Sequence, residues 1–321
     1  MSTPPTPERR RSIGATLEFA LTGPAGEPVD LRRTLSGHGV TSLPPMFVDE
    51  RRTSATVTLP VAGAQPREVV VRIGRPGFGA IDVVGDPPSA TKATSMLRDV
   101  RHLLRLDHDL SPFYALVADH PDIAWCVAGA GRMTRCLSTF EDVVKTICTT
   151  NCAWSATVRM ATALVRHLGE PAPDAPPESA EGRAFPTPAA MAAADESFYR
   201  EVVRAGYRGT YLKALAQSIV DGDVDLDAMC GGDGDEAADA ELSIRLQTLP
   251  GVGPYAAAHI MMMLGRSSFL VLDSWTRPTY AKRLGVEAVA DAAITARFAP
   301  YGRYAGLAFW VFLTRDWLDG A

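Results

Sequence analysis

The spacing of apolar residues changes once along the chain, near residue 90. Between residues 15 and 90, short β-branched runs such as 55–59 and 68–73 are separated by turns that contain Gly or Pro. This alternation is typical of strands that bury one face. We therefore expect an antiparallel sheet of about five strands in this part of the chain.

From Ala90 onward the apolar positions recur with helical spacing. Leu97, Val100, Leu103 and Leu104 mark one face of the first helix. The same spacing predicts helices near 111–119, 140–150, 153–168, 188–193, 196–204, 209–221, 239–249, 254–264, 274–284, 289–297 and 302–316. The predicted fold class is α+β, mainly α, with a small antiparallel β domain at residues 15–93 and a helical domain at residues 94–321.

The ends of the chain and its apolar stretches carry no targeting or membrane signal. Residues 1–14 are rich in Pro and Arg and lack the apolar core of a signal peptide, so we expect a disordered tail. The longest apolar stretches, 260–264 and 307–313, fall far short of a spanning helix. We expect a cytoplasmic protein, associated with the nucleoid if it binds DNA, and no membrane partner.

A glycine-containing turn separates two of the predicted helices, within residues 246–264. It consists of Pro250, Gly251, Val252 and Gly253. Glycine permits left-handed or closely approached backbone, and Pro254 suits the first helical position. The next free amides, such as that of Tyr255, lie at the positive end of a helix dipole. This helical hairpin is therefore predicted to bind a phosphate.

One carboxylate follows this hairpin. Asp273 comes eighteen residues after Tyr255, between an apolar helix and the sequence Ser-Trp-Thr-Arg. A Pro-Gly-x-Gly turn is common between helices, and an aspartate at this position suits an ordinary helix N-cap. The combination of hairpin, apolar helix and acid in this order favours a functional site, and capping is compatible with catalysis.

These features resemble the helix-hairpin-helix DNA glycosylase superfamily, whose hairpin reads Leu-Pro-Gly-Val-Gly and whose catalytic aspartate follows it. Residues 147–154, 205–211 and 301–308 are similar to motifs of its 3-methyladenine and 8-oxoguanine DNA glycosylase branch, in the same order, and residues 30–38 show a weaker similarity. The resemblance implies two helical bundles flanking a cleft, with the N-terminal β-sheet domain beside them.

The resemblance also implies roles for individual residues. A glycosylase flips the damaged nucleotide out of the duplex, and Asn151, with Thr150 beside it, is expected to fill the gap. Asn151 also suits a cap for the helix that begins near Ala153. Asp273 is expected to stabilise the positive charge that develops on the sugar and to orient or deprotonate water.

The position after Pro254 distinguishes two classes within this superfamily. Bifunctional members carry a lysine there, whose amine forms a Schiff base with the sugar, whereas this chain has Tyr255. A phenol cannot form an imine, so we expect a monofunctional DNA N-glycosylase, a hydrolase without AP-lyase activity. The expected base pocket consists of Tyr255, His259, Met263, Phe309 and Gly37, although each also suits a structural role.

The predicted substrate is an alkylated or otherwise modified purine. Where 8-oxoguanine enzymes have a glutamine and a phenylalanine that read the base, this chain has Phe309 and Leu313. An aromatic pocket instead attracts electron-poor, positively charged bases. Two alternatives stay open: an oxidised-purine or mismatch glycosylase, and a non-catalytic helix-hairpin-helix protein that binds lesions.

The net charge of −5 looks unfavourable for a DNA-binding protein. Residues 221–241 contain nine acidic and no basic residues, however, which leaves +4 for the rest of the chain. We expect this acidic segment to be a solvated loop held away from DNA. Candidate phosphate contacts are Arg132, Arg135, Lys145, Arg159, Arg208, Arg266, Arg277, Lys282 and Arg283.

The five cysteines, an odd number at irregular spacings, favour a reducing compartment over a disulfide framework. Endonuclease III and its relatives hold an iron–sulfur cluster with four cysteines after the catalytic domain, but no cysteine follows Cys230 here. We expect no such cluster, no metal and no required cofactor, with the hairpin carbonyls as a candidate site for a structural monovalent cation. The expected partner is double-stranded DNA with a damaged base, bound by a monomer.

Overall fold

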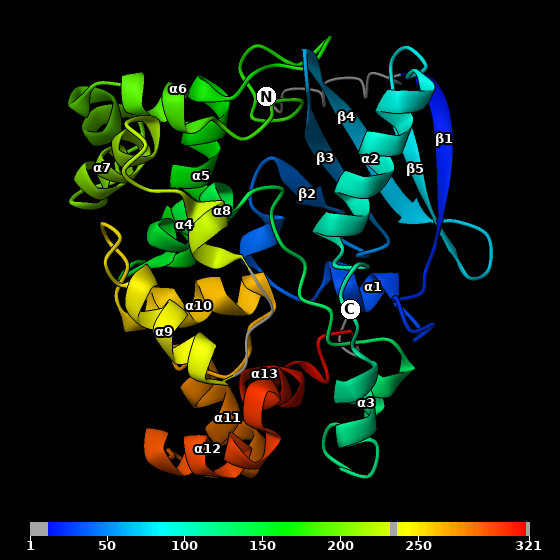
Figure 1. Cartoon of the computed structure of the whole chain (residues 1–321), viewed down its shortest axis with the longest axis vertical. Helices are drawn as coiled ribbons and strands as arrows, with labels where there is room; N and C mark the ends of the chain where they lie inside the picture. Colours follow the sequence, from blue (N-terminus) through cyan, green and yellow to red (C-terminus); the bar gives the residue numbers. More distant parts are fainter. Residues whose placement is uncertain (1–11, 232–235, 319–321) are drawn as a thin grey trace, which may run out of the picture.

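The computed structural model describes residues 12–231 and 236–318. A β-sheet with one helix packed against it lies on one side of the molecule, and most of the other helices lie beside and below it (Figure 1). The predicted tail lies outside the described residues up to residue 11, and Ile13 and Gly14 belong to the first strand. The sheet therefore begins slightly before the expected boundary at residue 15.

The sheet is antiparallel, with the strand order β1-β5-β4-β3-β2. Its strands are β1 (Ile13–Ala20), β2 (Met46–Val48), β3 (Ser54–Val61), β4 (Ala64–Ile73) and β5 (Phe78–Val84). Val57, Val69 and Val83 pair across β3, β4 and β5, and all three side chains are buried. This row belongs to the apolar face, because alternate residues of a strand point to the same side. The predicted five-stranded sheet is confirmed.

Helix α2 (Ala90–Leu103) packs against the sheet. Met96, Val100 and Leu103 are buried and belong to the same apolar core as the strands. The expected domain boundary between residues 93 and 94 therefore falls inside α2. A short helix that the apolar spacing did not indicate, α1 (Leu31–Leu35), begins at Asp30, whose side chain accepts a hydrogen bond from the Arg33 amide.

The remaining helices are α3 (Ser111–Val117), α4 (Thr139–Thr149), α5 (Trp154–Leu168), α6 (Pro188–Ala193), α7 (Arg208–Val220), α8 (Leu226–Cys230), α9 (Glu236–Leu246), α10 (Pro254–Leu264), α11 (Thr276–Leu284), α12 (Asp291–Phe298) and α13 (Ala305–Thr314). All of them follow the predicted ranges to within a few residues, except α8, which was not predicted. Short 3₁₀ helices lie at Val40–Ser42, Ala124–Ala128 and Ala299–Tyr304, and a π-helical turn at Phe198–Val202. None of the helices in the described part of the chain is long and apolar enough to cross a membrane.

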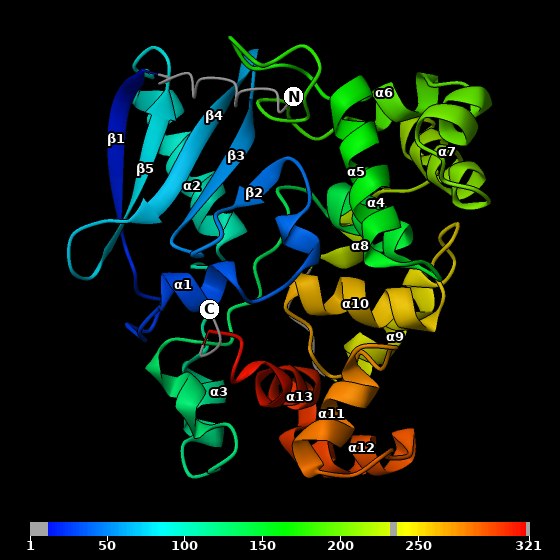
Figure 2. The ribbon, with the colours of Figure 1, turned by 180° about the vertical axis from the view of Figure 1, so that it is seen from behind.

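The helices form two bundles that share α10. Helices α4 to α9 surround one apolar core, and α3 with α11 to α13 surround a second. Ile260 and Met261 of α10 pack into the first core, Met262 packs into the second, and Tyr255 contacts both. Figures 1 and 2 show α10 between the upper bundle and α11–α13.

The acidic segment at residues 221–241 is not the solvated loop that the charge pattern predicted. It contains α8 and the first turns of α9, and residues 232–235 within it lie outside the described residues. Asp239 is buried, with Oδ1 3.1 Å from Nη1 of Arg266 and Oδ2 accepting from the Ser268 hydroxyl. One of the nine acids therefore pairs with a cation inside the fold, so the segment is partly structural.

A buried ion pair connects the chain beyond β1 to the helical part. Nη2 of Arg132 lies 2.6 Å from Oε1 of Glu27, and the two side chains are 0% and 4% exposed. Arg132 also donates to the carbonyls of Arg105 and His108, while the Leu110 amide donates to Glu27. Three chain segments therefore meet at these two side chains.

Candidate active site

The turn between α9 and α10 has the geometry that its glycines require. Gly251 has φ +80°, and a Cβ there would lie 2.9 Å from the ring of Tyr211. Val252 is buried in the core of the first bundle, whereas Gly253 and Pro254 are exposed. No side chain caps α10. The amides of its first turn are therefore directed to an exposed surface at the positive end of the helix dipole.

The turn after α4 carries the two residues expected to fill the gap left by a flipped base. Asn151 is exposed with φ +46°, and its side-chain amide donates to the Tyr207 hydroxyl at 3.2 Å. Nε of Arg208 donates to the Thr150 carbonyl at 3.0 Å. Ala153 is the N-cap of α5 and no side chain caps that helix, so Asn151 does not serve as its cap. Contacts from residues 205–211 instead hold this turn.

A cavity of about 370 Å³ opens where α10 faces α5, α13 and the segment before α11. Its wall is predominantly aromatic. Trp154, Tyr255, Trp275, Trp310, Trp317, His38 and His259 line it, together with Asp273, Thr149 and Cys152. Asp273, Tyr255 and His259 were predicted from the sequence, and the structure brings these three together.

Asp273 has two structural roles that leave one oxygen available. Its Oδ1 accepts from the amides of Trp275 and Thr276 at 2.8 and 2.7 Å, and the Thr276 hydroxyl accepts from the Asp273 amide at 2.8 Å. These bonds cap the start of α11. Among the described residues no hydrogen bond reaches Oδ2. The carboxylate is thus fixed by one oxygen while the other can serve the cavity, so capping and catalysis are compatible here.

Two histidines and a tyrosine form a buried group beside Asp273. Nε2 of His259 lies 2.7 Å from Nε2 of His38, and Nδ1 of His259 lies 3.2 Å from the Tyr255 hydroxyl. Burial lowers the pKa of His259 to about 4 against the opposing effect of Asp273, and burial and the neighbouring His259 lower that of His38 well below its ordinary value. Both imidazoles are therefore neutral at physiological pH.

Three tryptophans form a continuous part of the cavity wall. The Trp275 ring centroid lies 5.5 Å from that of Trp310 and 5.4 Å from that of Trp317, and the latter two are 5.9 Å apart. His38 lies 5.2 Å from Trp310 on the opposite flank. Rings at these separations and tilts offer faces against which a planar, electron-poor group can stack.

Three residues expected in the pocket lie elsewhere. Phe309 is fully buried between Tyr280 and Phe298 in the second bundle, and Met263 is fully buried beside Val40. Their side chains point into the cores that helical packing requires, so neither lines the cavity. On α13 the residue that does so is Trp310, one position after Phe309.

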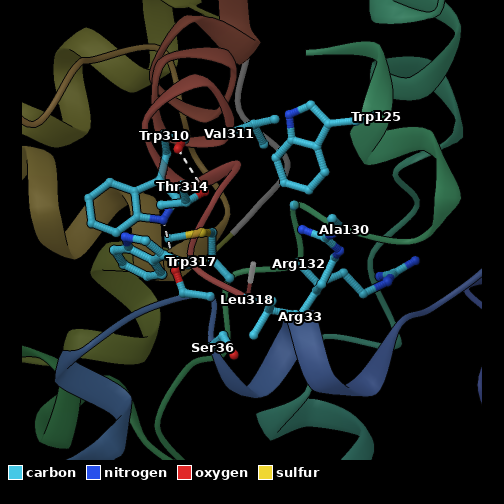
Figure 3. Close-up of a pocket in the computed structure, with 13 residues that line it drawn as sticks. Arg33, Ser36, Trp125, Ala130, Arg132, Trp310, Val311, Thr314, Trp317 and Leu318 are labelled. Atoms are coloured by element: carbon cyan, nitrogen blue, oxygen red, sulfur yellow. Dashed lines mark hydrogen bonds between the residues drawn. The ribbon is translucent and has the colours of Figure 1, made fainter. Parts of the chain in front are cut away.

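Gly37, the third of these residues, lies against a smaller neighbouring cavity of about 30 Å³, whose lining residues are drawn in Figure 3. Its carbonyl accepts a hydrogen bond from Nε1 of Trp310 at 2.7 Å. The next two residues, His38 and Gly39, reach the larger cavity instead. The N-terminal part of the chain thus contributes to the site through His38, which the sequence patterns did not single out.

Several basic residues predicted to contact phosphate cannot do so in this structure. Arg132, Lys145 and Arg208 are buried. Arg132 pairs with Glu27 and Lys145 with Glu141, while Arg208 supports the Thr150 carbonyl. The other six candidates are not buried: Arg135, Arg159, Arg266, Arg277, Lys282 and Arg283. Four of these six form ion pairs with acidic side chains, namely Arg135, Arg266, Arg277 and Arg283.

Nowhere in residues 12–231 and 236–318 do three His, Cys, Asp or Glu side chains gather as they would around a metal ion. The five cysteines are free thiols, and four of them are buried. Asp273, aromatic rings and neutral polar groups line the cavity.

No protein-family model and no curated protein matches the sequence. Solved structures match its fold. MBOgg1 in complex with a low-affinity DNA ligand has a TM-score of 0.71 at 17% identity, over 95% of this chain and 97% of that one. The 3-methyladenine DNA glycosylase from Archaeoglobus fulgidus has a TM-score of 0.71 at 16% identity, over 95% and 100%.

A third match is the 8-oxoguanine glycosylase/lyase of Clostridium acetobutylicum, solved with double-stranded DNA that contains cytosine opposite 8-oxoguanine. Its TM-score is 0.62 at 17% identity, over 87% of this chain and 100% of that chain. At identities this low the similarity shows the fold alone, and it extends over nearly the whole chain. The TM-scores confirm the predicted α+β class and the helix-hairpin-helix glycosylase fold.

Proposed function

Because the chain has the fold of DNA glycosylases, we propose that it is one: a monofunctional base-excision repair enzyme that hydrolyses the N-glycosidic bond of a flipped, alkylated purine. The observation that carries this proposal is the placement of Asp273. Its carboxylate lies on the wall of an aromatic cavity, beyond a helical hairpin with free amides. Double-stranded DNA is the proposed partner and a monomer the proposed active form.

Asp273 supplies the charge that the reaction needs. Cleavage of the bond between C1′ and the base develops positive charge on the sugar, and a carboxylate held beside it stabilises that charge without reorganising. Oδ1 is fixed by two amides, and Oδ2 can orient or deprotonate the attacking water. The hairpin amides would hold a phosphate of the strand, and Asn151 would fill the gap left by the base.

Tyr255 supports a monofunctional mechanism. Its phenol occupies the position of the lysine that forms an imine in bifunctional glycosylases. Burial raises the pKa of Tyr255, opposed by a hydrogen bond with Thr149, and the charge of Asp273 raises it further. The group stays a neutral phenol, so water is the nucleophile and the product is an intact abasic site.

The cavity wall supports a cationic purine as substrate. Aromatic faces attract a base that carries a positive charge, and the nearest charged group that faces the cavity is the negative Asp273. Neither buried histidine adds positive charge, because both are neutral. Bases such as 3-methyladenine and 7-methylguanine combine this charge with a planar ring, and both alkylated bases are weakly bonded to the sugar.

A panel of lesion-containing duplexes tests this proposal. The panel contains 3-methyladenine, 7-methylguanine, ethenoadenine, hypoxanthine, uracil, thymine opposite guanine, and 8-oxoguanine. We expect release of free methylated purine, measured by chromatography, with strand breaks only after alkali. Release of 8-oxoguanine alone would establish the oxidised-purine alternative. Strand breaks without alkali, with a borohydride-trapped complex, would contradict the monofunctional mechanism.

Substitutions of the two hairpin glycines are expected to affect stability and DNA binding differently. Gly251→Ala is expected to cost about 1–2 kcal/mol of unfolding free energy, because φ +80° and the Tyr211 ring both oppose a Cβ. Gly253→Ala should change stability by no more than about 0.5 kcal/mol, since nothing lies within 4 Å of its Cβ position. Urea unfolding measures both effects.

Gly253→Ala also tests the proposed phosphate site. A Cβ at Gly253 projects into the exposed space where a phosphate would approach the α10 amides, so we expect DNA affinity to fall by about tenfold or more at fixed salt. Fluorescence anisotropy with an abasic duplex measures this change. If Gly253→Ala binds the duplex as tightly as the wild type, the hairpin does not hold a phosphate.

A further inference from the structure

A chain of hydrogen bonds connects the segment after α1 to α10 through the wall of the cavity. The Val40 amide lies 3.3 Å from Nδ1 of His38, Nε2 of His38 lies 2.7 Å from Nε2 of His259, and Nδ1 of His259 lies 3.2 Å from the Tyr255 hydroxyl. His38 and His259 are 2% and 5% exposed, so water does not compete for the bond between the two imidazoles.

The direction of every bond in this chain follows from the backbone amide at its start. A backbone amide can only donate, so Nδ1 of His38 accepts and a neutral His38 carries its proton on Nε2. That proton points at Nε2 of His259, which must accept, so His259 carries its proton on Nδ1 and donates to the Tyr255 hydroxyl. The Tyr255 oxygen therefore accepts from His259, and its own proton points away from that ring.

Protonation of either histidine would place two hydrogen-bond donors against each other. Protonation of His38 would place an N–H against the Val40 amide, and protonation of His259 would place one against Nε2–H of His38. The charged groups that face the pair are Asp273, whose charge favours protonation of His259, and Arg105, whose charge opposes protonation of His38. Cys152, Trp310 and Tyr255 also lie in the cavity wall around the pair.

We propose that His38 and His259 are positioning residues that fix the orientation of the Tyr255 hydroxyl and keep the cavity wall beside Asp273 free of positive charge. The part that concerns substrate rests on the proposed function. A cationic purine entering the cavity then meets one negative charge and no cation, although two imidazoles line the wall. The selectivity for a charged base would thus depend on a hydrogen-bond pattern that originates outside the helical bundles.

Nitrogen-15 NMR of the histidine side chains in the full-length protein tests the hydrogen-bond pattern without any substrate. The spectrum contains six histidines, and the His38→Gln and His259→Gln spectra assign the pair. We expect His38 with its proton on Nε2 and His259 with its proton on Nδ1, both neutral between about pH 8 and pH 5. The reverse tautomers, or protonation of either ring near its ordinary pKa, would overturn the proposal.

The His38→Gln variant tests the consequence for substrate choice. A glutamine amide can turn either its donor or its acceptor toward His259, so His259 becomes free to take a proton. We expect the rate of 7-methylguanine release, relative to hypoxanthine, to fall by about tenfold in the variant between pH 8 and the pH at which its NMR spectrum shows His259 protonated, as ~1.4 kcal/mol of charge repulsion requires. The wild-type ratio should stay nearly constant.

His102→Gln is the matched control, because its side chain is 39% exposed and lies outside the cavity. It should behave as the wild type. A wild-type pH profile in His38→Gln would overturn the substrate part of the proposal. If no protein releases any base while the NMR result holds, the proposed function fails and the hydrogen-bond pattern stands.

Discussion

Replacement of Asp273 by Asn is expected to reduce base release by on the order of 10³-fold, because the amide cannot stabilise positive charge on the sugar. The fold should be unaffected. The Asn side-chain oxygen can still accept from the Trp275 and Thr276 amides, and Asn is as good an N-cap as Asp. Single-turnover release of the base from a lesion duplex measures the loss.

A second substitution separates capping from catalysis. Asp273→Ala removes both functions and should also cost about 1 kcal/mol of unfolding free energy, whereas Asp273→Asn should not. Both variants should still bind an abasic duplex. Base release at an undiminished rate by Asp273→Asn would exclude this carboxylate as the catalytic group, and a loss of stability equal to that of Ala would contradict the capping geometry.

Removal of Glu27 is expected to destabilise the protein by about 3–5 kcal/mol, since it leaves the guanidinium of Arg132 buried without its counter-ion. The matched control is Glu18→Ala. Nε of Arg75 lies 3.2 Å from Oε2 of Glu18, but the Arg75 and Glu18 side chains are 57% and 47% exposed. Loss of this pair should therefore reduce the unfolding free energy by less than about 1 kcal/mol. Urea unfolding of Glu27→Ala and Glu18→Ala measures the difference.

The ion pair also predicts how stability depends on pH. Burial raises the pKa of Glu27, but hydrogen bonds from the Leu110 amide and from Arg132 outweigh it, so the net pKa is lowered from 4.5. Its contribution is therefore fully present above the unfolded pKa and is lost as the pH falls through the lower, folded value. Glu27→Ala should remove this part of the acid sensitivity. An unchanged acid profile would contradict the assignment.

The sequence predicted the elements of this fold better than its pocket. Helical spacing fixed nearly every helix, because each packs one apolar face against a core. The short helix α8 was missed, since five residues carry too little periodicity. The end of α9 was predicted three residues late, because backbone hydrogen bonds continue through residues 247–249, where two of the three reach back three residues instead of four.

Within the site, the predicted pocket residues were correct where they lie on the same helix. Tyr255 and His259 are four residues apart on α10 and therefore share a face. Phe309 was predicted to line the pocket and does not, because it belongs to a helix that is buried on nearly all sides, where the apolar pattern does not show which side chain faces the cavity. The contact between His38 and His259 joins residues 221 positions apart, and local pattern contains no information on such a pair.

The position of α10 between the two bundles has a mechanical consequence. Ile260 and Met261 on one side and Met262 on the other are buried in different cores, so rotation of one bundle against the other would expose part of α10 to water. Exposure of such side chains costs about 1.5–3 kcal/mol each. The two cores therefore fix the width of the cavity, and under the proposed function we expect the distortion that brings C1′ to Asp273 to come from the DNA.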